Sequence, residues 1–257
     1  MKRIKYIIGL VLLSTFSCSE KNNYLGDDIR LWKGIEAWEF AQNISKNNFK
    51  EAEAIMKKNK IDIDFREQKF GETLLSWAVL NANLDAVKFL VSHGADPNAH
   101  DTYDGTSPIA IASDYFIRSD ILIYLLEHGG NPNDYVKKDE TLSYAPTNET
   151  PLIRAAFTSL EKTKILVKAG ADVNFSANND FYDTPLLSAE RRTNLDVVEY
   201  LIFECKADYR NSYVVTIDTR DTLTFMDLIQ KRRLKTPKDS IAVMKILEYI
   251  DEESRKE

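Results

Sequence analysis

The chain is poor in the residues that build disulfide frameworks and metal centres. Its 257 residues include two cysteines, Cys18 and Cys205, and three histidines. These counts exclude a disulfide scaffold and a cysteine-rich zinc site, and they argue against a His-rich metal site. Glycine (9) and proline (7) are scarce, which excludes a collagen-like or low-complexity chain. With no Gly-rich phosphate loop either, we expect no metal, no cofactor and no catalytic residues.

A long apolar run is also missing. The stretch over residues 6–13 is apolar but too short to cross a bilayer, which needs about 20 residues. The net charge of −6 argues against a protein that coats nucleic acid. The length, with 44% hydrophobic residues, is enough for a sizeable core in one large domain or two small ones.

The first residues predict export. Basic residues at positions 2, 3 and 5 precede the apolar run, and the small Ser17 stands directly before Cys18. This order is typical of a secretory signal peptide. The placement of Cys18 resembles the bacterial lipoprotein signal, which implies that Cys18 is lipidated and that the protein lies in the cell envelope, facing the periplasm or the cell surface. An ordinary secretory signal with an incidental cysteine is the alternative.

These features predict three segments. Residues 1–17 form the signal peptide, residues 18–34 a polar tether that begins at Cys18, and residues 35–257 the folded body. Removal of the signal takes away three of the 34 basic residues and no acidic one. The mature chain then has 31 basic and 40 acidic residues and a net charge of −9.

The body of the chain repeats itself. Four related octamers occur, GETLLSWA at 71–78, GTSPIAIA at 105–112, NETPLIRA at 148–155 and YDTPLLSA at 182–189, and a weaker copy, TFMDLI, lies at 224–229. Each is followed by an apolar pattern with helical spacing. The first four units then close in a turn, GADPN at 94–98, GGNPN at 129–133, GADVN at 170–174 and CKAD at 205–208.

The Thr or Ser of these octamers recurs at positions 73, 107, 150, 184 and 224, with spacings of 34, 43, 34 and 40 residues. The pattern resembles the ankyrin repeat, a unit of about 33 residues with a T-P-L-H-x-A opening, two helices and a turn. The resemblance implies an all-α solenoid of stacked helix-turn-helix units with β-hairpin fingers. We expect about six repeats, with degenerate caps at both ends, over residues 35–67, 68–101, 102–144, 145–178, 179–218 and 219–257.

Local chemistry supports this pattern. Thr or Ser before Pro suits a helix N-cap followed by Pro at the first helical position. Gly94, Gly129 and Gly170 stand where a helix must end in a left-handed residue, and Asp-x-Asn can bond turn backbone. His93 and His128 precede two of these glycines, so we expect them to bond the last helix carbonyls. The Gly-His usual between the two helices is absent, and Cys205 or its neighbour replaces the fourth turn glycine.

Two spacings exceed 34 residues, and the extra residues fall after Asn133 and after Asp208. Residues 213–217 are β-prone, so we expect a lengthened two-stranded finger there. Insertions in repeat arrays often map to a binding face, although a tolerated surface insertion is the alternative.

Ankyrin-like proteins bind partners through the finger tips and the ends of the first helices, so the resemblance implies a protein partner. We expect the chain itself to be a monomer. The residues at these positions that do not fit the stacking template are the candidates for contact, because aromatic and Arg residues are the usual interface anchors. They are Phe70, Tyr103, Asp104, Tyr115, Phe157, Asp180, Phe181, Arg191 and Arg192. Packing between neighbouring fingers is the alternative role for several of them.

Three further hypotheses remain. By analogy, an exported ankyrin-like protein can be an immunity protein that covers the active surface of a toxin, and an acidic chain suits a basic toxin. An enzyme or small-molecule binder is a remote alternative, because repeat stacks rarely enclose a deep pocket. The basic cluster at 231–235 is expected to be a solvated helix end, with contact to an acidic partner as the alternative.

Overall fold

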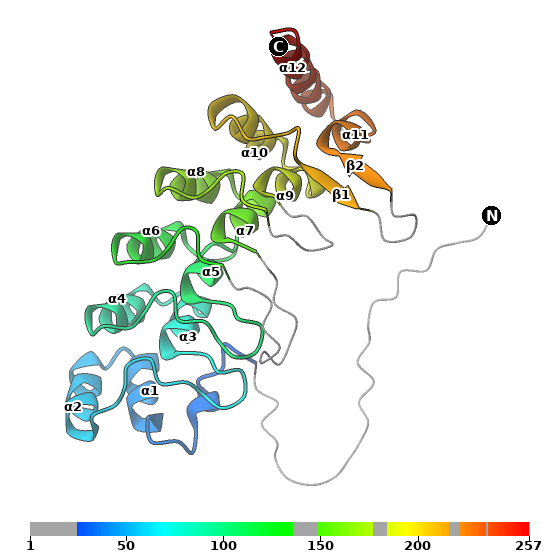
Figure 1. Ribbon diagram of the computed structural model, residues 1–257. Helices are drawn as coiled ribbons and strands as arrows, with labels where there is room; N and C mark the ends of the chain where they lie inside the picture. The colour runs from blue at the N-terminus through cyan, green and yellow to red at the C-terminus, as the bar shows by residue number, and fades with distance from the viewer. Residues whose placement is uncertain (1–24, 136–148, 177–183, 216–220, 235, 257) are drawn as a thin grey trace.

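The computed structural model describes residues 25–135, 149–176, 184–215, 221–234 and 236–256. In these residues twelve α-helices form six pairs that stack one on the next (Figure 1). The pairs are α1 (Trp38–Ser45) with α2 (Phe49–Asn59), α3 (Leu74–Leu80) with α4 (Leu84–Ser92), α5 (Pro108–Ala112) with α6 (Ser119–Glu127), α7 (Pro151–Thr158) with α8 (Leu160–Lys168), α9 (Pro185–Arg191) with α10 (Leu195–Glu199), and α11 (Phe225–Gln230) with α12 (Pro237–Ser254). A short 3-10 helix, η1 (Ile29–Trp32), precedes them. The expected all-α solenoid is confirmed.

The recurring Thr or Ser begins the first helix of every pair except the outermost N-terminal one. The side-chain oxygen of Thr73, for example, accepts a hydrogen bond from the Ser76 amide at 3.2 Å. Helices α5, α7 and α9 also have proline at the start of the helix, as expected. Proline suits this position because its missing N–H would have no partner inside the helix.

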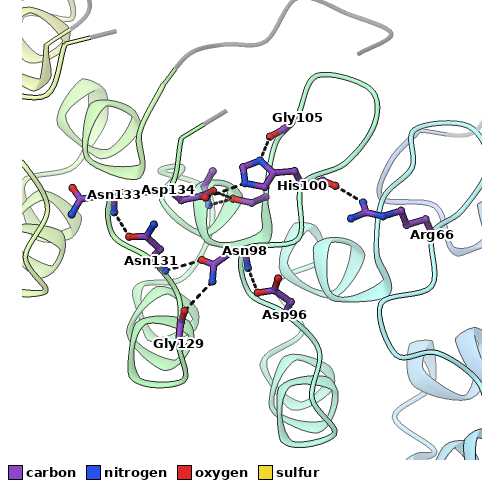
Figure 2. A network of polar contacts seen from close by, with 11 residues as sticks. Arg66, Asp96, Asn98, His100, Gly105, Gly129, Asn131, Asn133 and Asp134 are labelled. Atoms are coloured by element: carbon purple, nitrogen blue, oxygen red, sulfur yellow. Dashed lines mark hydrogen bonds and ion pairs between the residues drawn. The ribbon is translucent and has the colours of Figure 1, made fainter. Parts of the chain in front are cut away.

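The turns after the second helices tie neighbouring repeats together (Figure 2). Gly94, Gly129 and Gly170 are left-handed, with φ of +95°, +96° and +92°. The Asn98 side chain donates to the Gly129 carbonyl at 2.9 Å and accepts from the Asn131 amide at 2.7 Å. Asn133 makes the same pair of bonds to the Gly170 carbonyl and the Asp172 amide. The last Asn of these two turns, Asn98 or Asn133, therefore bonds the backbone of the next repeat, whereas only bonds within its own turn were expected.

The fifth repeat has one residue more in its second helix. The left-handed residue that ends this helix, Lys206 (φ +55°), lies one position further from the N-cap Asn194 than Gly94 lies from Asn83, the N-cap of α4. The extra residue is absorbed by a π-helical turn, η2 (Tyr200–Glu204). Lys206, the neighbour of Cys205, thus takes the place of the turn glycine.

The predicted finger after Asp208 is present. Strand β1 (Tyr213–Val215) pairs antiparallel with β2 (Thr222–Thr224), with Tyr213 opposite Thr224. Figure 1 shows this hairpin on the side of the stack where the first helices lie. The other insertion, after Asn133, falls almost wholly outside the described residues.

The core is divided into two apolar clusters that meet at α7, where Ala155 belongs to the first and Ala156 to the second. The first runs from η1 to the turn after α8, and the second covers α9 to α12. On α12, the second helix of the C-terminal cap, Ile241 and Met244 are 56% and 60% exposed. None of the described helices combines the length and the apolar character that a membrane crossing requires.

Candidate protein-binding groove

Three adjoining hollows follow the first helices and the loops that precede and follow them. Their volumes are about 410, 340 and 420 Å³. The first and second share Asp114, Glu149 and Arg154 as lining residues. The second and third share four residues, Tyr115, Phe157, Thr158 and Arg192. The hollows therefore form one continuous depression, here called the finger groove, from Phe70 to Asn194.

The first hollow has an aromatic wall. Phe70 and Tyr103 meet edge to face with their ring centroids 5.3 Å apart, and the Lys69 ammonium lies 4.6 Å from the centre of the Phe70 ring. Asp101 shapes the loop that carries Tyr103, because its Oδ1 accepts from the amides of Tyr103, Asp104 and Gly105 at 2.9, 3.0 and 2.9 Å. Burial, and then the charge of Asp104, raise the pKa of the Asp101 carboxyl.

Glu72 lies in the same hollow and is only 9% exposed. Its Oε2 is buried and has no hydrogen-bond partner among the residues that the structure describes. Burial first, and then the negative charges of Glu67, Asp101, Asp104 and Asp27, raise the pKa of Glu72 to about 8. This carboxyl is therefore mainly protonated at neutral pH.

An ion-pair network forms the centre of the finger groove. Arg154 on α7 reaches Asp114 and Glu149, each at 3.4 Å, and donates to the Thr106 hydroxyl at 3.3 Å. The Arg154 side chain is 12% exposed. Burial raises the pKa of both carboxyls, and the charge of Arg154 opposes that shift. The network fixes the charges where the first two hollows meet.

A buried lysine holds the exposed aromatic loop between α5 and α6. The Lys162 side chain from α8 donates to the carbonyls of Ala112, at 2.8 Å, and Asp114. Burial lowers the pKa of Lys162 to about 8. The loop then presents Tyr115 and Phe116, which are 70% and 55% exposed. Because α5 is only five residues long, the Ala112 carbonyl at its end has no other donor among the described residues, whereas the Asp114 carbonyl also accepts from the Ile117 amide at 3.1 Å.

The far end of the finger groove is aromatic and basic. Phe157, at the end of α7, is 37% exposed, and the Arg192 guanidinium lies 5.2 Å from the centre of its ring. Arg191 lines the second hollow together with both residues. A cation against an aromatic face is typical of protein interfaces.

Seven of the nine residues predicted for partner contact line these hollows, namely Phe70, Tyr103, Asp104, Tyr115, Phe157, Arg191 and Arg192. Asp180 and Phe181 lie outside the described residues, as does Cys18. Sequence reasoning missed the roles of Arg154 and Lys162. One signal was present for Arg154, because the other three octamers have Trp77, Ile111 or Ser188 at its position.

One residue of the basic cluster at 231–235 differs from expectation, whereas Lys231 and Arg233 are exposed, as a solvated helix end requires. Arg232 is not solvated, because its guanidinium pairs with Glu190 on α9 at 2.8 Å and its side chain is only 5% exposed. Burial raises the pKa of the Glu190 carboxyl, and the Arg232 charge opposes this. Arg232 thus joins the last helix pair to α9 rather than facing a partner.

The histidines have structural partners. The Nδ1 atoms of His93 and His128 lie 2.8 Å from the carbonyls of Phe89 and Tyr124, one turn earlier, which confirms the expected helix-end role. His100 Nδ1 contacts the Gly105 carbonyl at 2.8 Å, and its Nε2 contacts Asp134 Oδ1 at 3.0 Å (Figure 2).

Ser107 donates to the other oxygen of Asp134, so serine, aspartate and histidine do come together. The carboxylate lies between the other two, and Ser107 is fully buried. This arrangement gives no activated nucleophile, since the histidine does not contact the hydroxyl. No group of three or more His, Cys, Asp or Glu residues in the described ranges is placed to hold a metal ion.

A family model described as ankyrin repeats, in three copies, matches residues 41–139. The chain is 34% identical over 90 residues to the Notch-regulated ankyrin repeat-containing protein of Xenopus tropicalis, which covers 34% of this chain and 76% of that protein. It is 29% identical over 138 residues to a putative ankyrin repeat protein of fowlpox virus, covering 52% of this chain and 28% of the relative.

A third relative is alpha-latrotoxin-Lg1a of Latrodectus geometricus, 34% identical over 106 residues, which cover 41% of this chain. The match spans only 8% of the length of that toxin. The chain thus matches less than a third of the toxin and of the viral protein.

Proposed function

We propose, from the premise that this chain belongs to the ankyrin repeat family, that it binds another protein along the finger groove. The family consists generally of interaction scaffolds without catalytic activity. One observation carries the proposal for this chain, which is that the seven described candidate residues line one continuous depression. A rigid stack offers these side chains in fixed order, so little conformational entropy is lost on binding.

The anchors of the proposed interface are the exposed aromatic residues Tyr115 and Phe157 with Arg192. Aromatic and Arg side chains contribute most of the binding energy in typical interfaces. Here Lys162 holds the loop of Tyr115, and Phe157 supports the Arg192 guanidinium. Because these three anchors line an open groove, we expect a partner that lies along the surface rather than one that is enclosed in a pocket.

Substitution of the anchors tests this proposal. The double variant Tyr115→Ala/Phe157→Ala is expected to weaken capture of the native partner from envelope extracts at least tenfold, as measured on the recovered partner by surface plasmon resonance. The matched control is Ile241→Ala/Met244→Ala, which removes two exposed apolar side chains from α12. Equal affinity of the anchor variant and the unmodified chain, or an equal loss in the control, contradicts the choice of surface.

We also propose that the protein is exported and lipid-anchored through Cys18. The support is the order of basic residues, apolar run and Ser17 before Cys18. Mass spectrometry of the mature N-terminus is expected to find a diacylglyceryl group on Cys18, and Cys18→Ala to abolish it. Recovery of the intact chain beginning at Met1 as the mature form contradicts this proposal.

An immunity role is a narrower form of the same proposal. The acidic residues of the first hollow favour a basic partner, which agrees with the net charge of the mature chain. A toxin gene beside this one, and inhibition of that toxin by the purified chain, are the expected results. A neighbouring toxin that the chain fails to inhibit opposes it.

A further inference from the structure

The first hollow of the finger groove is strongly acidic. Five carboxyl side chains line it, against the single basic residue Arg154 among the lining residues that the structure describes, and they are Glu72, Asp101, Asp104, Asp114 and Glu149. The volume of about 410 Å³ is large enough for a long side chain. The excess of carboxyls makes the hollow attractive to a cation.

Most of these carboxyls already have partners. Asp114 and Glu149 pair with Arg154, and Asp101 accepts three backbone amides. Asp104 uses one oxygen to accept from the Thr106 amide at 3.0 Å. Glu72 differs, because its Oε2 has no partner within the described ranges although the residue is only 9% exposed. An unpartnered buried carboxyl oxygen costs free energy that a bound donor would recover.

The shape of the hollow selects an organic cation. No three of the described carboxyls converge closely enough to hold a metal ion. The walls are partly apolar, with the rings of Phe70 and Tyr103 and the side chain of Ile111. A planar guanidinium suits such a site, since it lies flat on aromatic rings and donates several hydrogen bonds to carboxylates.

We propose that this hollow, the acidic pocket, receives an arginine side chain of the protein partner, which pairs with Glu72 and Asp104. This rests on the proposed function and names the chemistry that the partner offers at one end of the finger groove.

The charges around Glu72 give the pocket a pH response. Burial is the largest cause of the raised pKa of Glu72, and the negative charges of nearby carboxyls add to it, namely Glu67, Asp101, Asp104 and Asp27. The other charged residues at this hollow are Lys69 on its aromatic wall and Asp114, Glu149 and Arg154 across it. A bound guanidinium favours the carboxylate and lowers this pKa. Binding below pH 8 therefore releases a proton, so the affinity rises with pH from about 6 to 8 and then levels off.

The test uses acetyl-Gly-Gly-Arg-Gly-Gly-amide and its Gln twin, titrated into the full folded chain and followed by amide NMR. The Arg peptide is expected to shift the amides of Phe70, Glu72, Tyr103 and Gly105 with Kd on the order of millimolar, because a single side chain supplies the contact. The affinity at pH 8.5 is expected to be at least about fivefold higher than at pH 6.5. The Gln twin is expected to give no such shifts.

Glu72→Gln is the diagnostic variant, because the amide closely matches the protonated carboxyl in shape and the fold is retained. We expect it to bind the Arg peptide at least about fivefold more weakly at pH 8.5 and to lose the pH dependence. Glu51→Gln, at an exposed carboxyl on α2, is the control and is expected to bind as the unmodified chain does.

Equal shifts from the Arg and Gln peptides, or unchanged binding and pH dependence in Glu72→Gln, overturn the arginine pocket. The proposed function fails separately. If Glu72→Gln captures the native partner as the unmodified chain does while Tyr115→Ala/Phe157→Ala does not, the finger groove stands as the binding surface and only the arginine pocket is wrong.

Discussion

At the scale of single residues, Glu72 makes the stability of the fold depend on pH. Its pKa is about 8 in the folded chain, against an ordinary value of 4.5. Between these values the folded state holds a proton that the unfolded state has lost, so the free energy of unfolding falls as pH rises from about 4.5 to 8. Glu72→Gln removes this loss and is expected to be more stable than the unmodified chain at pH 8.5, by about 1–3 kcal/mol.

Urea unfolding at pH 5 and pH 8.5 measures this effect. The unmodified chain is expected to lose more stability between the two pH values than Glu72→Gln does, while the exposed control Glu51→Gln follows the unmodified chain. Parallel profiles for Glu72→Gln and the unmodified chain would show that the carboxyl is ionised in the folded state and that its buried oxygen has found a partner.

His100 responds to pH in the same direction, through a different contact. The hydrogen bond to Asp134 is the main cause that raises the pKa of His100 above 6.5. Its contribution to stability is complete below about pH 6.5 and is lost as pH rises through the folded pKa. NMR titration of the His100 ring is expected to show a lower midpoint in Asp134→Asn than in the unmodified chain. Ser107→Ala removes the other contact of Asp134 and the N-cap bond of α5 but leaves the His100 contact in place, so it should keep the raised midpoint. A fall of equal size in that variant, with the fold retained, argues against the pairing.

At the scale of helices and turns, the sequence predicted most of what is observed. The N-caps, the left-handed glycines and the finger strands follow from local backbone rules that a short motif records. The contacts of Lys162 and Arg154 were not predictable in this way, since Lys162 reaches carbonyls about 50 positions away and Arg154 reaches Asp114 40 positions away. Such contacts depend on how repeats stack, which the spacing of motifs does not specify.

The missing glycine between paired helices has a measurable cost. The backbone is still left-handed there, at Asn47, Ala82 and Thr193, with φ of 57°, 50° and 66°. Of these three residues, Thr193 is the least suited to the left-handed conformation, because its side chain is β-branched. Thr193 is exposed, so Thr193→Gly is expected to raise the free energy of unfolding by about 1 kcal/mol in urea titrations.

Gly94→Ala is the reverse experiment, because it adds a side chain at a left-handed position that glycine occupies. Gly94 has φ of +95°, and an added Cβ would meet no atom of the described residues within 4 Å, so the backbone conformation is what the variant tests. We expect a loss of about 1 kcal/mol. If Thr193→Gly lowers the free energy of unfolding while Gly94→Ala also lowers it, the Thr193 side chain makes a favourable contact that outweighs its backbone strain.

At the scale of the whole molecule, the regular motif predicted one continuous stack, which is observed, and within that stack the buried apolar residues form two clusters. The octamers keep their register across α7, so nothing in their spacing reveals a boundary. The division comes from side-chain size: the two clusters meet on α7 at the small neighbours Ala155 and Ala156. The clusters remain in contact, because Val173 packs against both and the Ser188 hydroxyl on α9 donates to the Ile153 carbonyl on α7 at 2.9 Å, but the small alanines themselves bury little apolar area at the junction.

This division predicts that the two halves open separately. Leu75 and Leu201 are both fully buried, one in each cluster, and replacing either by Ala is expected to cost about 2–5 kcal/mol. In a stack whose repeats contact only their neighbours, that loss stays near its origin. Hydrogen exchange should therefore speed up across α9 to α12 in Leu201→Ala and across α1 to α6 in Leu75→Ala. Leu234→Ala, at a residue 42% exposed, controls for substitution at the surface. A uniform increase over the whole chain in both core variants would show instead that α7 couples the clusters into one cooperative unit, because the helix then transmits each cavity across the junction.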